Sequence, residues 1–223
     1  WMPETWVRET PGCRYSQPHK ADPWWPVEAG LAYNRMIRPL LRYGFAGAVW
    51  YQGESNRDNP ANYAALMQAL IASWRREAGR DFPFYMVQIA PYRYGATDNG
   101  PALIREAQDQ VARSVPGVGL AVVSDCVEDL TPINKRPVGR RLALLALGKH
   151  YKRLKGVFES PFLLRSEVKD DKVVLTFSSV QNGLVCRGKE IAGLQIAGAD
   201  GRFVEATGRI NTRNQLVVSS REV

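Results

Sequence analysis

The sequence predicts an α/β fold, a parallel sheet covered by helices on both faces, followed by a smaller β-rich module. Three observations support this prediction. Short apolar runs alternate with helical patterns before residue 156, which is typical of a parallel sheet. Polar residues gather where two of these runs end. Near Gly156 the pattern changes to short strands between Gly, Asn and Asp turns, which indicates an all-β unit.

Bulk composition is that of a globular protein. The 223 residues suffice for one large domain or two small ones, and 45% of them are hydrophobic. The net charge of +8 comes from 30 basic and 22 acidic residues. The basic residues are spread along the chain, whereas a nucleic-acid binder more often shows a dense stripe with interleaved aromatics. No run reaches the ~18 apolar residues of a membrane span. We therefore expect neither a nucleic-acid nor a membrane partner.

Metal and cofactor chemistry is not indicated by the sequence. Cys13, Cys126 and Cys186 are widely separated and form no C-x-x-C pair, and the only histidines are His19 and His150. A zinc site is therefore not expected. We expect no cofactor, and the sequence leaves open whether two of the cysteines form a disulfide.

The N-terminal part is expected to be irregular and then helical. Prolines recur through residues 1–27 and interrupt any periodic pattern, so we expect an irregular segment held by its tryptophans against an apolar surface. Apolar residues from Glu28 to Arg42 favour a helix, with Pro39 as a kink or an end.

The next elements form a strand, a polar turn and a helix. Ala48 to Tyr51 is apolar and is interpreted as a short buried strand. Asp58-Asn59-Pro60 is a helix start with a capping side chain, and Gly79 marks the helix end. Between them the apolar residues follow the spacing of one buried helix face: Tyr63, Leu66, Met67, Leu70, Ile71 and Trp74.

The same alternation continues and then stops. Strands are expected at 82–89 and 119–124, and helices at 101–113 and 140–151. Strands of the β-rich part are expected at 173–177, 203–207 and 216–219. These patterns predict a domain at 1–155 and a module at 156–223.

The polar turn after the first strand is the main candidate site. Gln52, Gly53, Glu54, Ser55 and Asn56 supply two amides, a carboxylate and a hydroxyl group. In an open α/β sheet the carboxyl ends of the strands border the ligand crevice. Gly53 also permits a close backbone approach or a positive φ. The alternative is an ordinary solvated turn, since loops are polar for many reasons.

A nucleophilic serine is one chemical interpretation of this turn. Gly53-Glu54-Ser55 stands at a strand-to-helix turn, but Arg57 occupies the last position of a G-x-S-x-G elbow. Ser55 would also need a base, for which His19 and His150 are the available histidines. His150 ends an apolar helix, where a cation is favoured by the helix dipole.

The run from Trp50 to Asn56, Trp-Tyr-Gln-Gly-Glu-Ser-Asn, resembles the signature of sialate O-acetylesterases and related SGNH-type carbohydrate esterases. The resemblance extends over nearly the whole chain. Further matching stretches are 31–39, Trp74-Arg75, 82–88, Arg105 to Gln108, Asn134-Lys135, 138–143, 193–198 and 200–203.

The resemblance implies an SGNH-type three-layer fold and hydrolysis of acetyl esters on sugars by a serine, a histidine and an acid. The family's nucleophile lies in an earlier Gly-Gln-Ser-Asn block, and this sequence contains no such block. Domain 1–155 is therefore expected to be N-terminally incomplete, and module 156–223 to be cut short. Gln52, Gly53 and Glu54 match the block that lines the site and helps to hold the oxyanion or substrate. Ser55 is then a neighbour of the site.

The resemblance also implies a deficiency in the third block. Asp129 matches the acid that orients the base, and Thr131 stands where the family has its histidine. A threonine hydroxyl cannot take a proton as imidazole does, so we expect little or no esterase activity from this chain alone. The alternative is a non-catalytic, carbohydrate-binding pseudo-esterase. The family implies an acetylated glycan as substrate and a secreted, periplasmic or lysosomal location, and the oligomeric state stays open.

Overall fold

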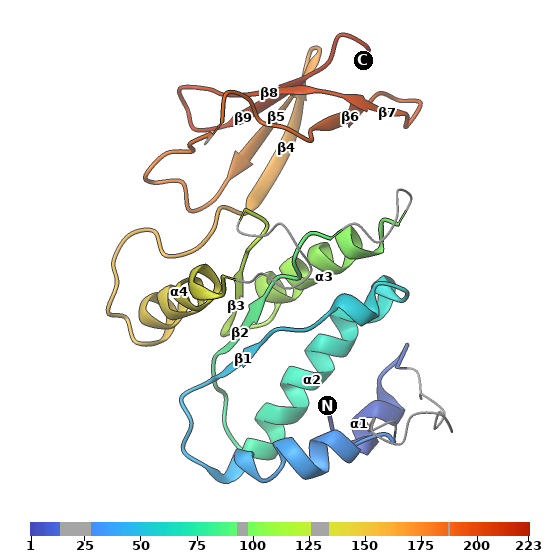
Figure 1. Cartoon of the computed structure of the whole chain (residues 1–223), viewed down its shortest axis with the longest axis vertical. Coiled ribbons are helices and arrows are strands. Elements are labelled where there is room, and N and C mark those ends of the chain that lie inside the picture. The colour runs from blue at the N-terminus through green and yellow to red at the C-terminus, as the bar shows by residue number, and fades with distance from the viewer. Residues whose placement is uncertain (14–27, 93–97, 126–133, 187) are drawn as a thin grey trace. The chain divides into compact units, whose positions relative to one another are not determined.

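The computed structural model describes residues 1–13, 28–92, 98–125, 134–186 and 188–223. The chain divides into two compact units, Trp1–Arg153 and Leu154–Val223. The first unit contains a parallel sheet with helices, and the second contains antiparallel strands (Figure 1). Whether either unit is incomplete, as the family resemblance implies, stays a prediction.

The first unit is built on a three-stranded parallel sheet in the described residues. Its strands are β1 (Ala48–Trp50), β2 (Phe84–Val87) and β3 (Val118–Ala121), in the order β1-β2-β3. Every residue of β2 and β3 is buried. Continuous apolar runs are what a strand covered on both faces requires, so the predicted α/β fold with a parallel sheet is confirmed.

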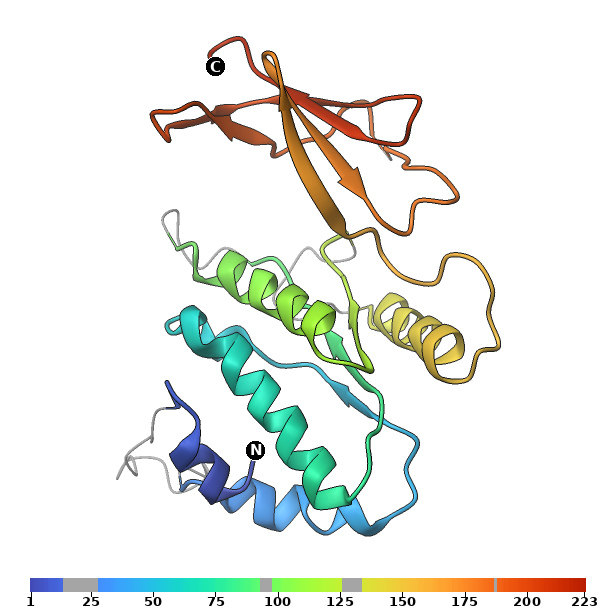
Figure 2. The same ribbon diagram turned by 180° about the vertical axis from the view of Figure 1, so that it is seen from behind.

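Helices cover both faces of this sheet. The main helices are α2 (Tyr63–Ala78), α3 (Gly100–Ser114) and α4 (Arg136–Leu145). Figures 1 and 2 show α2 and α3 side by side on one face. Their core residues, such as Ile71 and Ile104, form one cluster with Phe84 and Met86. The opposite face is packed by α4, whose Leu145 forms a separate cluster with Tyr85 and Ala121.

The strand β1 differs from the prediction of a buried strand. It is an edge strand, and its central residue Val49 leaves 66% of its surface exposed. Ala48 and Trp50 are only partly buried. The prediction of burial was wrong because apolar composition does not reveal how far a helix extends over the face on which Val49 lies. The α4 side of the sheet is packed at β2 and β3.

The helix after the polar turn begins later than the sequence predicted. A 3₁₀ turn, Pro60–Asn62, precedes α2, and no side chain caps either element. The Asn59 Oδ1 instead accepts a hydrogen bond of 2.8 Å from Asn62 Nδ2. The other end agrees with prediction, because Gly79 takes a left-handed φ of 64° and its N–H reaches the last turn. Of the expected packing face, Leu66 is the member that is only half-buried.

The residues before β1 differ from the prediction in two ways. A helix forms where an irregular segment was expected, and the expected helix is replaced by two shorter turns. Within 1–27, a short helix α1 (Glu4–Glu9) follows Pro3, whose fixed φ suits a helix start. Residues 14–27 lie outside the described residues. The helix expected over 28–42 is a π-helical turn (Tyr33–Ile37) and then a 3₁₀ turn (Leu40–Arg42) that begins after Pro39. The final helix α4 likewise continues as a π-helical segment, Ala146–His150.

The second unit contains two small antiparallel sheets. The larger has the order β4-β5-β9-β8 and the smaller pairs β6 with β7. The strands are β4 (Leu163–Lys169), β5 (Lys172–Phe177), β6 (Gln195–Ala197), β7 (Phe203–Glu205), β8 (Thr207–Ile210) and β9 (Leu216–Ser219). The single run expected at 203–207 is thus divided between two strands of different sheets. Among the described residues no helix is long and apolar enough to traverse a lipid bilayer.

Candidate functional site

The predicted turn after β1 lies at the carboxyl edge of the parallel sheet, together with polar residues that follow β2 and β3. Gln52 and Gly53 follow β1, Gln88 follows β2, and Ser124 follows β3. Parallel strands bring these positions to one edge, where ligand crevices of open α/β sheets form. The structure therefore places the turn after β1 where the sequence analysis expected a site.

Gly53 has a backbone conformation and an environment that exclude a side chain. Its φ is 151° and its ψ is −16°. A Cβ atom here would lie 2.8 Å from Ile89 Cγ2, and 3.2 Å from both Ile104 Cγ2 and the Tyr63 hydroxyl oxygen. The glycine thus lets the turn pack directly on the apolar core beneath it, and then enter the 3₁₀ turn Glu54–Asn56.

Two buried side chains hold the carbonyl group of Gln52 from the core side. The Tyr63 hydroxyl donates to the Gln52 oxygen over 2.8 Å, and Gln108 Nε2 lies 3.2 Å from the same oxygen. Burial raises the pKa of Tyr63 to about 12, although its hydrogen bond with Gln108 acts in the opposite direction. Tyr63 therefore stays a neutral donor at any physiological pH.

The polar side chains of the turn contact one another. Gln52 Nε2 donates to Asn56 Oδ1 over 2.7 Å, which braces the turn across the 3₁₀ segment. Glu54 is half-buried. Burial raises the pKa of Tyr51, and the charge of Glu54 raises it further. The carboxylate of Glu54 thus lies near enough to both Tyr51 and Tyr63 to affect their ionisation.

The second and third strands contribute a smaller polar group. Ser124 Oγ lies 3.4 Å from Gln88 Oε1, and Gln88 Nε2 lies 3.4 Å from the carbonyl oxygen of Arg105. Gln88 thereby links the ends of β2 and β3 to α3. At this distance the two hydrogen bonds are weak.

Lys135 joins the start of α4 to the end of β1. Its Nζ lies 5.2 Å from the centroid of the Tyr51 ring, within the range of a cation–π contact. Lys135 is exposed, and Tyr51 keeps 36% of its surface exposed. This edge of the sheet therefore carries an exposed cation.

An ion pair fixes the chain just after β3. Arg141 of α4 binds Asp125 through two nitrogens, at 2.6 and 2.7 Å, and also donates to the carbonyl oxygen of Val122. Asp125 immediately precedes residues 126–133, which the structure does not describe. Asp129 and Thr131 fall within that gap, so their predicted roles stay predictions.

No hydrogen bond joins Ser55 to His150 among the described residues, so Ser55 as a nucleophile stays an untested interpretation. Ser55 is exposed in the 3₁₀ turn. His150 is the one histidine among the described residues, and it ends the helical segment that follows Lys135. At 1.5 Å per residue, roughly 20 Å along the helix axis separates His150 from Lys135. His150 is exposed and its ring contacts Tyr151. His19 lies outside the described residues.

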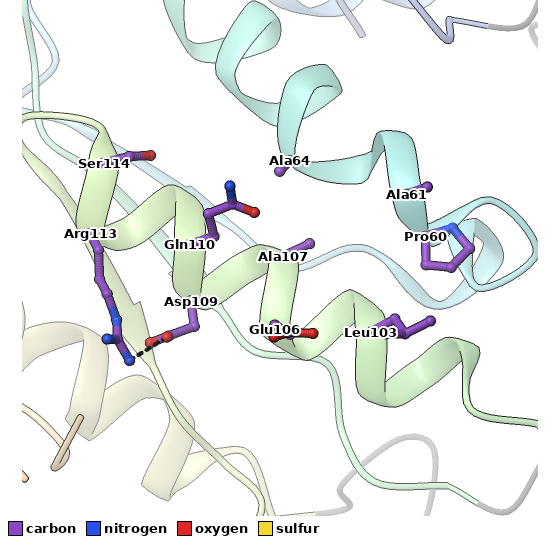
Figure 3. A pocket seen from close by; sticks show the side chains of 10 residues that line it. All are labelled: Pro60, Ala61, Ala64, Leu103, Glu106, Ala107, Asp109, Gln110, Arg113 and Ser114. Carbon is purple, nitrogen blue, oxygen red and sulfur yellow. Dashed lines mark ion pairs between the residues drawn. The ribbon is translucent and has the colours of Figure 1, made fainter. Parts of the chain in front are cut away.

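A groove of about 680 Å³ lies elsewhere, between α3 and the start of α2 with the 3₁₀ turn before it (Figure 3). Its lining mixes small, apolar and charged side chains: Pro60, Ala61, Ala64, Leu103, Glu106, Ala107, Asp109, Gln110, Arg113 and Ser114. The predicted residues Gln52, Gly53 and Glu54 do not line it. Asp109 and Arg113 form an ion pair with each other along α3. The groove therefore contains none of the site residues predicted from the sequence.

The described part of the chain contains no cluster of three or more His, Cys, Asp or Glu side chains that could hold a metal ion. Cys13 and Cys186 are free thiols. Cys126 lies outside the described residues.

Several residues of the site were not identified by sequence reasoning. Tyr63 was expected only as a packing residue, and Gln108 appeared only within a matching stretch of the family. A glutamine between the buried helix positions Ile104, Ala107 and Val111 was the available signal, because a buried amide requires hydrogen-bond partners.

Comparison with known proteins gives one consistent result. The carbohydrate esterase family described as sialic acid-specific acetylesterase matches residues 20–146. The sialate O-acetylesterase of Rattus norvegicus is 33% identical over 64% of this chain and 30% of its own length. That of Homo sapiens is 31% identical over 70% of this chain and 34% of its own length.

A solved structure agrees with these sequence matches. A carbohydrate acetylesterase from Xanthomonas citri is similar over 86% of this chain and 46% of its own, with a TM-score of 0.76 and 36% identity. This chain therefore spans about a third of the curated relatives and under half of the solved one. These relatives are all described as esterases and give no support to the non-catalytic alternative.

Proposed function

Because this chain belongs to the sialic acid-specific acetylesterase family of carbohydrate esterases, we propose that it functions in the hydrolysis of O-acetyl esters on sialic acid or a related glycan. The reaction breaks the bond between the acetyl carbon and the sugar oxygen. Water supplies the hydroxyl of the released acetic acid and the proton of the sugar. The single observation that carries the proposal is the position of the Gln52–Gly53–Glu54 turn at the carboxyl edge of the sheet.

The chemistry proposed for this turn is stabilisation of negative charge. Attack on an acetyl ester places a full negative charge on the carbonyl oxygen of the tetrahedral intermediate. Preorganised donors aimed at that oxygen contribute strongly, and losing one costs about 10²–10³ in rate. The peptide N–H of Gly53 and the side-chain amide of Gln52 are the donors that we assign to this task.

The names of the relatives define the substrate only as an acetylated sugar. The curated relatives are named for sialate, an anionic sugar, and the solved one for carbohydrate in general. Lys135 at the edge of the site is exposed and cationic, which supports an anionic sugar. The proposal therefore favours an O-acetylated sialic acid over an acetylated neutral glycan.

We propose that the Gln52–Gly53–Glu54 turn supplies neither the nucleophile nor the base. The sequence contains no Gly-Gln-Ser-Asn block, and Thr131 stands at the position of the family histidine. A catalytic unit that lacks members keeps only the contribution of binding and of the oxyanion donors. We therefore expect this chain alone to release acetate slowly or not at all.

The test is an assay of acetate release from O-acetylated sialic acid and from an acetylated neutral glycan. It would use the chain alone and the chain produced with whatever coding sequence precedes it. If that sequence supplies a Gly-Gln-Ser-Asn block, turnover should appear and Thr131→His should increase it. Binding of the acetylated sugar without turnover in every version would favour the pseudo-esterase.

Ser55→Ala serves as the control for residue assignment. This substitution should leave any turnover unchanged, because Ser55 is proposed to be only a neighbour of the site. Turnover by the chain alone that Ser55→Ala abolishes would overthrow the assignment and make Ser55 the nucleophile.

A further inference from the structure

The carbonyl group of Gln52 is unusual in being held by two donors from the buried side of the turn. Tyr63, on α2, donates over 2.8 Å, and Gln108, on α3, approaches to 3.2 Å. Tyr63 keeps 1% of its surface exposed and Gln108 keeps none. The direction of the carbonyl group is therefore set by two helices of the fold rather than by the turn itself.

Gln108 also links this turn to the next strand. Its Oε1 accepts a hydrogen bond of 2.9 Å from the N–H of Ile89, and its Nε2 lies 3.4 Å from both the Val87 carbonyl oxygen and the Tyr63 hydroxyl oxygen. One buried amide thus fixes the turn after β1 relative to the end of β2. An uncharged side chain with both a donor and an acceptor is required for this arrangement.

The fixed carbonyl group determines where the next amide points. The described chain contains no cis peptide bond, so the Gly53 N–H is directed opposite to the Gln52 carbonyl group. It therefore points away from the Tyr63 hydroxyl and the Gln108 side-chain amide. Within the described residues no acceptor is bonded to this N–H.

We propose that Tyr63 and Gln108 are positioning residues that hold the Gln52–Gly53 peptide so that the Gly53 N–H faces the substrate's carbonyl oxygen. This inference rests on the proposed function, because it assigns the geometry behind the oxyanion donor. Neither residue touches the substrate. They act by fixing the peptide plane before the reaction, which is what makes such a donor effective.

A purely structural role for the pair makes a different prediction. Buried polar groups are hydrogen-bonded in any stable protein, and breaking such bonds lowers stability wherever they lie. A positioning role adds a specific effect on the Gly53 amide and on the binding of an oxygen anion to it. The test therefore requires a signal from that amide as well as a measure of folding.

The experiment uses acetate, the acid that the reaction would release, as the probe of the donor. Amide resonances of the ¹⁵N-labelled chain would be followed by nuclear magnetic resonance during a titration with sodium acetate, against sodium chloride at equal ionic strength. Four proteins are compared: the unchanged chain, Tyr63→Phe, Gln108→Met and the control Gln110→Met. Gln110 lies on the same helix and is exposed. Thermal unfolding of each protein reports folding.

Acetate should shift the Gly53 amide resonance of the unchanged chain and of Gln110→Met alike. Tyr63→Phe and Gln108→Met should each bind acetate roughly three- to tenfold more weakly, because each loses a hydrogen bond that orients the donor. If one of these two variants does not fold, the other one provides the test. Tyr63→Phe is the milder change, because it removes only one oxygen atom.

Two results would overturn the inference. A Gly53 amide that does not respond to acetate in the unchanged chain is not an oxyanion donor. An unchanged acetate affinity in folded Tyr63→Phe and Gln108→Met would leave the pair with a structural role alone. Failure of the proposed hydrolase function would instead appear as absent acetate release in every version, including the chain produced with its preceding coding sequence and Thr131→His, with an intact response at Gly53. The two failures are therefore distinguishable.

Discussion

The ammonium group of Lys135 lies 5.2 Å from the centroid of the Tyr51 ring, which connects the first residue after β1 to the start of α4. A cation over an aromatic ring at an exposed position contributes about 0.5–1 kcal/mol. Lys135→Gln should therefore lower the free energy of unfolding by about that amount. Urea denaturation of Lys135→Gln, Tyr51→Leu and the double variant would give the coupling energy. The exposed Lys155, changed to Gln, is the control, and additive single effects would rule out the contact.

The ion pair between Asp125 and Arg141 should be worth more than a pair within one helix. The two bonds of 2.6 and 2.7 Å join the end of β3 to α4, and the Arg141 side chain is only 25% exposed. We expect Asp125→Asn to destabilise the chain by about 1 kcal/mol. Asp109→Asn, which breaks the i,i+4 pair with Arg113 on α3, should cost about 0.3–0.5 kcal/mol. Equal costs in urea denaturation would contradict the prediction.

Gly53 should not accept a side chain without a clear loss of stability. Alanine at this position meets Ile89 at 2.8 Å and must adopt a φ of 151°. Together the strain and the overpacking should cost about 2–4 kcal/mol. Gly44→Ala is the matched control, since a Cβ there meets no atom within 4 Å. Chemical denaturation of both variants checks the prediction, and a mild effect of Gly53→Ala would mean that the turn can relax.

The stability of the chain should fall at alkaline pH because of Tyr63. Its pKa is raised from 10.0 to about 12 in the folded state, mainly by burial. The unfolded state loses this proton first, so stability is intact below about pH 10 and declines toward pH 12. The full loss from this one group is about 2–3 kcal/mol. Denaturation measured across this pH range should show a smaller decline in Tyr63→Phe than in Tyr43→Phe, whose ring is exposed. Identical declines would mean that other groups dominate.

Periodicity was sufficient to predict the elements whose burial follows a regular pattern. The apolar spacing from Tyr63 to Trp74 and the following Gly79 gave α2 and its end. The continuous apolar runs of β2 and β3 gave the parallel sheet, since both faces of those strands are covered. These features depend on residues that are close in sequence, so the sequence alone contains them.

Features that depend on distant neighbours were predicted less well. The exposure of Val49 depends on how far α4 extends over its face of the sheet. The missing side-chain cap before Pro60 depends on the 3₁₀ turn that replaces the first helical turn. At the site, contiguous residues such as Gln52 and Gly53 were predicted. Gln108 was not, because its role exists only once α3 has packed against the turn.

The exposed edge of β1 has a consequence for the behaviour of the polypeptide in solution. Among the described residues β1 has a neighbouring strand on one side only, and an apolar strand with an unpaired side is a template for pairing with another extended chain. Preparations of this polypeptide are therefore expected to self-associate as their concentration rises, independently of any glycan. Because Val49 is the exposed midpoint of that strand, a lysine at this position is the simplest change to improve solubility without disturbing the core.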